Sequence, residues 1–128
     1  MLFSKPYERE YAESIAIPAA YAEGAEVSYS EGVVQIEEVQ TEQDAVLVRG
    51  SYAVSAILMG EGLAPLRVSE AFEFNERIPA QDCTADMEAT ADGFFTSLTA
   101  TLKQEAEGEP SLRFHGICEF SCAAEKNE

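Results

Sequence analysis

The sequence predicts an all-β protein: a two-sheet sandwich or partly closed barrel built from two pseudo-repeated three-stranded units. An apolar or small residue stands at every second position from Val46 to Leu58 and again from Leu112 to Ala124. The two stretches match in order at a constant offset of 66 positions (112 minus 46), with Gly50 answering to Gly116. Because side chains alternate faces along a strand, each stretch is expected to be a long strand with one buried face.

The likeness between the two halves extends upstream of these strands. Ile17-Pro18-Ala19 recurs as Ile78-Pro79-Ala80, and Glu31-Gly32 recurs as Asp92-Gly93, both at an offset of 61 (78 minus 17). The difference between the two offsets fits an insertion in the loop-like segment from Glu105 to Pro110. A chain of 128 residues suits one domain, 1–128, with pseudo-repeats at about 7–58 and 65–124. We expect the units to exchange their long strands across a common core.

The remaining elements follow from local pattern. Tyr7 to Ile17 is strand-like, and Pro18 to Gly24 suits a single helical turn with proline near its start and glycine past its end. Val27 and Val34 fall on opposite parities of the next alternating stretch, which indicates a β-bulge at Gly32.

The sequence also predicts two turns and one further strand. Thr41 to Asp44 predicts a turn into the first long strand, and Met59 to Gly62 predicts a hairpin-like loop. Strands resume near Leu66 to Phe74.

The segment from Asp82 to Gln104 fits two patterns. Apolar residues from Met87 to Leu102 recur at three- and four-residue steps, as in an amphipathic helix, but those from Phe94 to Leu102 also alternate as in a strand. The repeat decides in favour of a strand, because its partner segment around Val27 to Val39 is rich in Val and Ile and carries Gly32 where this one has Gly93.

Charge narrows the classes of partner. The chain has 24 Asp and Glu against 8 Lys and Arg, for a net charge of −16. Such a field repels nucleic-acid phosphates and anionic membrane surfaces. No apolar run approaches the roughly 20 residues of a membrane span. We therefore expect neither nucleic-acid binding nor membrane insertion, and cations, basic proteins or a second copy of the chain stay possible as partners.

The three cysteines are predicted to be core residues and not to form disulfides. Cys118 and Cys122 share one strand face, but four residues along a strand span about 13 Å, too far for a disulfide. With Cys83 they are expected to be small apolar core residues in a reducing compartment. The first six residues do not resemble a secretory signal, so a cytoplasmic protein is expected.

One stretch resembles a known family. The run Val48 to Leu58, a Gly-rich turn, Pro65, Glu70-Ala71-Phe72-Glu73-Phe74 and Ile78-Pro79 is similar to the SPOCS domain, over about Gln43 to Ala124. SPOCS domains occur in spore-coat and spore-morphogenesis proteins of endospore-forming bacteria. The resemblance implies a binding or scaffolding role in layer assembly, with possible deposition on the forespore surface.

The sequence gives little evidence for a catalytic or metal-binding site. His115 and Cys118 are three residues apart on an alternating strand, so their side chains are expected to face opposite ways, and no cofactor motif is present. Asp82, Asp86, Glu88 and Asp92 are candidate calcium ligands, but their spacing does not match an EF-hand loop. We expect no enzyme activity, no cofactor and no metal.

The aromatic residues and the outward-facing apolar residues have different expected places in the fold. Four aromatic residues, Tyr7, Tyr11, Phe72 and Phe74, are expected to fill the core. The outward positions of the long strands include Leu47, Ile57, Met59 and Ile117, which either lie under a second layer or form a surface for another subunit.

The sequence thus predicts a non-enzymatic protein-interaction or structural module that self-associates. The alternative is an acidic β-domain that binds a cation or cationic ligand. Calorimetric titration with calcium and polyamines separates the two, because a specific site saturates at a defined stoichiometry.

Overall fold

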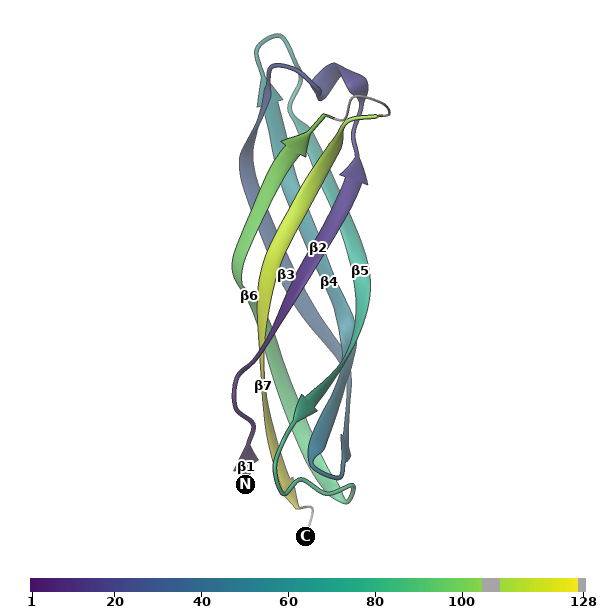
Figure 1. Ribbon diagram of the computed structural model, residues 1–128, viewed down its shortest axis with the longest axis vertical. Helices are drawn as coiled ribbons and strands as arrows, with labels where there is room; N and C mark the ends of the chain where they lie inside the picture. The colour runs from purple at the N-terminus through teal and green to yellow at the C-terminus, as the bar shows by residue number, and fades with distance from the viewer. Residues whose placement is uncertain (105–108, 127–128) are drawn as a thin grey trace.

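The computed structural model describes residues 1–104 and 109–126 and shows an elongated β-sandwich (Figure 1). The elements in chain order are β1 (Leu2–Phe3), β2 (Tyr7–Ala16), the 3-10 turn η1 (Ala19–Tyr21), β3 (Ala25–Glu42), β4 (Ala45–Gly60), β5 (Leu66–Pro79), β6 (Met87–Lys103) and β7 (Ser111–Lys126). The predicted all-β class is confirmed, and so are the strand in the ambiguous segment and the single helical turn after Pro18. Most of the predicted loop from Glu105 to Pro110 lies outside the described residues.

The strands form two antiparallel sheets. The three-stranded sheet has the order β3–β4–β5, and the four-stranded sheet has β7 at its centre, with β1 and β2 paired along one edge and β6 along the other. Each sheet therefore contains a strand from the other half of the chain. The exchanged strands are β2 and β5, the first strand of each unit, and not the long strands β4 and β7 that the sequence suggested. β4 and β7 instead stay paired with the strands that precede them, β3 and β6.

Equivalent residues of the two halves make equivalent strand pairs. Gly32 pairs with Val54 in one sheet and Gly93 pairs with Phe120 in the other, so the glycines differ by 61 positions and their partners by 66, as the sequence offsets do. A Cβ on Gly32 would lie 2.5 Å from the Phe95 ring. A Cβ on Gly93 would lie 3.1 Å from Val34, the residue that stands 61 positions before Phe95. The contacts between β3 and β6 are thus reciprocal.

The β-bulge predicted at Gly32 is in the wrong place. Gly32 pairs without interruption, and the register of β3 shifts between Val27 and Tyr29 and again between Ile36 and Glu38. The parity switch therefore occurs at Ser28, four residues earlier. The glycine has a different role, because only a residue without a Cβ leaves room for the Phe95 ring against its backbone.

The core lies between the two sheets. Alternate residues of β4 and β7 are buried, and Phe74 of β5 packs on Phe120 of β7 with ring centroids 5.2 Å apart. The rings of Tyr11 and Tyr52 stack across the sheets at 4.5 Å. The four aromatic residues predicted to be core, Tyr7, Tyr11, Phe72 and Phe74, are confirmed as parts of this cluster. All three cysteines are buried free thiols, as expected.

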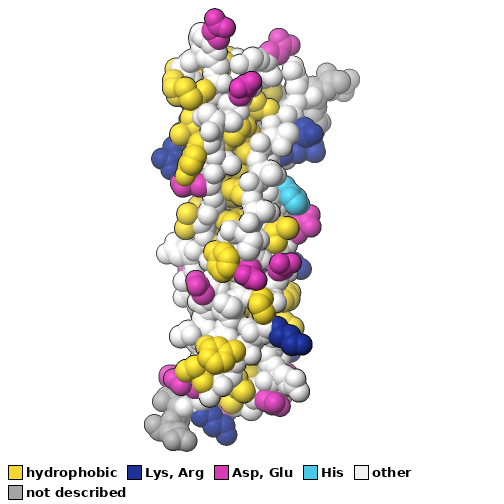
Figure 2. Space-filling model, turned by 90° about the vertical axis from the view of Figure 1, so that its left-hand side faces the viewer, with side chains coloured by type: hydrophobic (Ala, Val, Ile, Leu, Met, Phe, Trp, Pro, Cys, Tyr) yellow, Lys and Arg dark blue, Asp and Glu magenta, His cyan; other side chains and the backbone are white. Residues whose placement is uncertain are grey.

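The two long edges of the sandwich differ. At one edge β3 and β6 run side by side, tied near one end of the molecule by a hydrogen bond of 2.7 Å from the Thr41 hydroxyl to the Met87 carbonyl. Figure 2 looks onto this edge and shows hydrophobic side chains exposed along its height. At the other edge β2 and β5 are joined through side chains, since Arg9 and Tyr11 both donate to Glu76 at 3.0 and 2.9 Å.

Candidate interaction surface

The four outward residues predicted from the sequence lie on two different faces. Leu47, Ile57 and Met59 project from β4 on the outer face of the three-stranded sheet, whereas Ile117 projects from β7 on the outer face of the four-stranded sheet. Leu47 and Ile57 are also about 34 Å apart along their strand, because each residue advances the chain by about 3.4 Å. The four residues therefore do not make one patch, and the two faces have to be compared.

The outer face of the three-stranded sheet is built from twenty residues in cross-strand rows. We use the name outer face for this set throughout. Its members are Glu26, Tyr29, Glu31, Val33, Gln35, Glu38 and Gln40 of β3; Leu47, Arg49, Ser51, Ala53, Ser55, Ile57 and Met59 of β4; and Arg67, Ser69, Ala71, Glu73, Asn75 and Arg77 of β5.

The half of the outer face nearer to Glu61 carries most of its exposed apolar side chains. Val33 is 58% exposed and forms a row with Ala53 and Ala71, while Tyr29 is 52% exposed and lies beside Ile57. Met59, at 47% exposure, extends the same strip. The polar row of Glu31, Ser55 and Ser69 lies between these two apolar rows. Water therefore contacts several large and small apolar side chains close together, an arrangement that typically marks a contact surface.

Tyr29 and Val33 were not among the residues identified from the sequence. Alternation places the side chains of a regular strand, but in β3 the shifts at Ser28 and Glu37 reset which residues face outward. The available signal was the pairing partner: both residues pair with outward positions of β4, Ile57 and Ala53.

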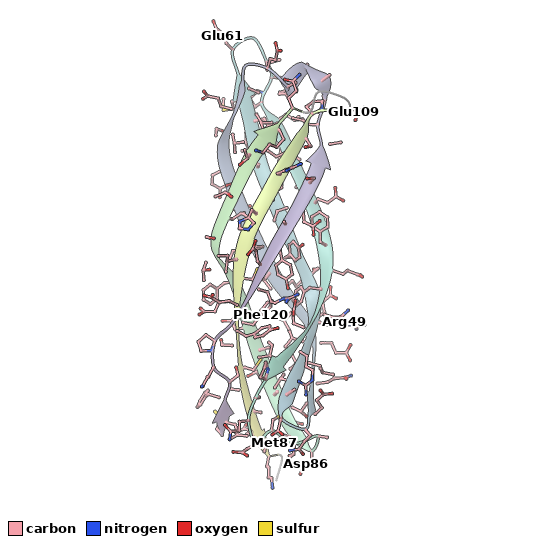
Figure 3. The ribbon with its side chains drawn as sticks, viewed as in Figure 1. Arg49, Glu61, Asp86, Met87, Glu109 and Phe120 are labelled. Carbon is pink, nitrogen blue, oxygen red and sulfur yellow. The ribbon has the colours of Figure 1, made fainter. Side chains whose placement is uncertain are left out.

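The other half of the outer face is charged and grooved. Leu47 lies in a groove of about 440 Å³ that is also lined by Arg49 and Arg77. Arg49 contacts Glu38 at 2.5 Å, and the Arg77 Nε donates to Glu42 at 2.6 Å. Figure 3 shows Arg49 at the side of the molecule, in the half that ends at Asp86 and Met87. Both arginine side chains remain more than half exposed, so their charge is available to a partner.

The outer face of the four-stranded sheet is polar by comparison. Ile117 lies between Glu10 of β2 and Ser97 of β6, and His115 next to it contacts Glu10 at 2.6 Å. The outward acidic residues outnumber the two outward cationic residues, Arg113 and Lys103, by six to two; they are Glu8, Glu10, Glu88, Asp92, Glu119 and Glu125. This face is therefore acidic, but it is not free of apolar side chains: Phe94, paired with Glu119, is 47% exposed, and Phe3, paired with Ala123, is 75% exposed, in addition to the half-buried Ile117.

A tyrosine and glutamate network closes the edge between β2 and β5. Tyr11 donates to Glu76, which is only 8% exposed, and Tyr52 donates to Glu13. Burial, reinforced by the hydrogen bond to Glu76, raises the pKa of the Tyr11 phenol. Burial and the bond to Glu13 raise the pKa of the Tyr52 phenol in the same way. Both phenols stay protonated as donors, which suits a structural link between the sheets.

The residues considered for metal binding do not converge. His115 is exposed while Cys118 is buried, so the two side chains face opposite ways as predicted. Asp86 accepts a hydrogen bond from Thr84, and Asp92 accepts one from the Gly93 backbone. In the described parts of the chain, no three His, Cys, Asp or Glu side chains are grouped to hold a metal ion.

Comparisons with known proteins give no relative. No protein-family model, curated protein or solved structure matches this chain. Within residues 1–104 and 109–126, none of the helical structure is long and apolar enough to span a membrane. The chain's own surface is therefore the guide to its function.

Proposed function

We propose that this protein is a non-enzymatic interaction or structural module that self-associates through the outer face. The observation that carries the proposal is the group of apolar side chains formed by the exposed Tyr29, Val33 and Met59 around the half-buried Ile57. Burying such side chains against another protein removes apolar area from water, which stabilises an assembly by about 25 cal/mol for each Å². The outward side of the four-stranded sheet also exposes Phe3 and Phe94, but these lie on a surface with six acidic side chains, which repels a second acidic copy more strongly.

A non-enzymatic role is supported by how the reactive side chains are used. His115 is engaged with Glu10, the three thiols are buried, and the buried Glu76 holds together strands from both sheets. The resemblance of Val48 to Pro79 to the SPOCS domain supports a place in spore-coat or spore-envelope assembly. In that role the protein would be made in the cytoplasm and deposited on the forespore surface.

The two central isoleucines provide a matched test of the proposed surface. Ile57 and Ile117 are both half-buried and both lie on the outward side of a central strand, but on opposite sheets. Ile57→Ser should shift the monomer–oligomer equilibrium toward monomer in light scattering, while Ile117→Ser should leave it unchanged. Equal effects of the two substitutions would remove the outer face as the contact surface.

The spore assignment has a separate test in an endospore-forming host. A fluorescent fusion of the full chain should collect around the forespore during sporulation. Uniform cytoplasmic fluorescence through the whole process would argue against envelope assembly while leaving self-association to be judged by light scattering.

A further inference from the structure

The charges on the outer face are nearly balanced, unlike those of the rest of the molecule. Its acidic members are Glu26, Glu31, Glu38 and Glu73, and its basic members are Arg49, Arg67 and Arg77. Three of the chain's eight cationic residues are thus gathered on a surface with a net charge of −1, although the whole chain carries −16. A basic partner would be drawn more strongly to the acidic surfaces elsewhere, whereas a second acidic copy meets the least repulsion here.

The charges are also sorted by strand. Glu31 and Glu38 lie on β3, at one side of the face, while Arg67 and Arg77 lie on β5, at the other side. The central strand β4 separates them and carries small residues at Ser51, Ala53 and Ser55. Glu73 also lies on β5 and Arg49 on β4. The face therefore has an acidic flank on β3, a centre on β4 that is narrow around Ala53, and on β5 a flank with a net charge of +1.

We propose that two copies stack face to face about a twofold axis that runs along β4, a dimer geometry that rests on the proposed self-association. This rotation places β3 of one copy over β5 of the other without changing the level of a residue along the strands. Glu31 shares a row with Ser69, one row from Arg67, so it comes within reach of Arg67 of the second copy. Glu38 shares a row with Asn75, one row from Arg77, and meets Arg77 of the second copy in the same way.

The apolar rows match under the same rotation. Val33 lies over Ala71 of the second copy, a large side chain against a small one, because Val33, Ala53 and Ala71 form one row. The two β4 strands meet through Ala53 and the neighbouring serines. Such interdigitation of large and small side chains is how aligned sheets pack. A twofold axis perpendicular to β4 would instead put the acidic β3 over its own copy.

The expected interface is modest in size. The outer face spans thirteen residues of β4, about 44 Å, and three strands, about 14 Å, which gives about 600 Å² on each copy. Two such faces bury about 1,200 Å², the lower end of the range for specific interfaces. The dimer should therefore dissociate on dilution, and the ion pairs should fix its orientation more than its strength.

Charge reversal distinguishes this dimer from others. Glu31→Arg alone and Arg67→Glu alone each create two like-charge contacts in a homodimer, so each should weaken dimerisation by at least about tenfold. Mixed in equal amounts, the two variants should form a heterodimer of wild-type affinity, because every contact is then between opposite charges. Glu8→Arg, which makes the same charge change on the four-stranded sheet, is the control and should not pair preferentially with Arg67→Glu.

The measurement is sedimentation equilibrium of each variant and of the mixture, with circular dichroism to confirm that each is folded. Recovery of the dimer in the mixture alone supports the twofold geometry. If wild-type protein dimerises but the mixture does not recover, the geometry is overturned while the proposed self-association stands. If wild-type protein is monomeric throughout, both the geometry and the proposed self-association fail.

Discussion

At Gly50, a Cβ atom would lie 2.1 Å from the carbonyl oxygen of Gln35 on the neighbouring strand. At Gly32 the corresponding contact is with the Phe95 ring, at 2.5 Å. A ring can shift more readily than a paired backbone. We expect Gly32→Ala to cost about 1–3 kcal/mol of unfolding free energy and Gly50→Ala to cost more than that. Urea unfolding of both variants, with the exposed Ser14→Ala as control, measures the order; a Gly50→Ala protein as stable as wild type would contradict it.

Cys118 contributes to the change of stability at alkaline pH. Burial raises the pKa of its thiol from 9.0 to about 12. Because the folded state disfavours the thiolate, this contribution to stability is complete below the pKa of the unfolded chain and is lost as pH rises from 9.0 toward about 12. The raised pKa values of Tyr11 and Tyr52 act in the same direction at still higher pH.

Unfolding free energies measured between about pH 8 and about pH 11 test this linkage. We expect them to fall over that range, and to fall less steeply in a Cys118→Ala variant. Stability that is constant or increases with pH would show that the thiol is not held neutral in the folded protein.

The strand exchange makes the two halves of the chain interdependent. β5 completes the sheet of β3 and β4, and β2 completes the sheet of β6 and β7. A protease site inserted at the exposed Gly62, in the loop between β4 and β5, should therefore give a nicked protein whose two pieces stay together. The pieces should separate only in denaturant. Elution of two smaller species on native size-exclusion chromatography would contradict the exchanged topology.

The strands themselves could be predicted, but their partners could not. Alternation from Val46 to Leu58 reflects a buried face, so β4 and β7 were visible in the sequence, and the repeat resolved β6. Which strand joins which sheet depends on backbone hydrogen bonds, which every residue but proline can make, so the exchange of β2 and β5 left no local signature. The bulge at Ser28 was missed for the same reason, since its position is set by pairing with β4.

The candidate surface was predictable only in part. Leu47, Ile57 and Met59 stand on the outward parity of β4 and were identified from it. Tyr29 and Val33 required the register of β3, and the separation of Ile117 from the others required knowledge of the two sheets. The placement of Glu31 and Arg67 on opposite sides of one face could not be predicted from their spacing in the sequence, because it depends on β3 and β5 both pairing with β4.

Net charge governs association at the scale of the whole molecule. Two copies that each carry −16 repel at long range, and salt screens this repulsion over a distance that shrinks from about 30 Å at 10 mM to about 8 Å at 150 mM. We expect association to strengthen over that range, because few ion pairs are lost compared with the repulsion removed. Sedimentation at several salt concentrations measures this trend. If association instead weakened steadily from the lowest salt concentration, the ion pairs across the interface would outweigh the long-range repulsion between the copies.

The most direct test of the account is the molar mass of the unmodified protein as its concentration rises. Sedimentation equilibrium at moderate salt, from about 1 µM to about 1 mM, covers the range in which a small interface should fill. We predict a weight-average mass that starts at the monomer value of 13.9 kDa and approaches twice that value. A mass that stays at 13.9 kDa at every concentration would contradict self-association through the outer face.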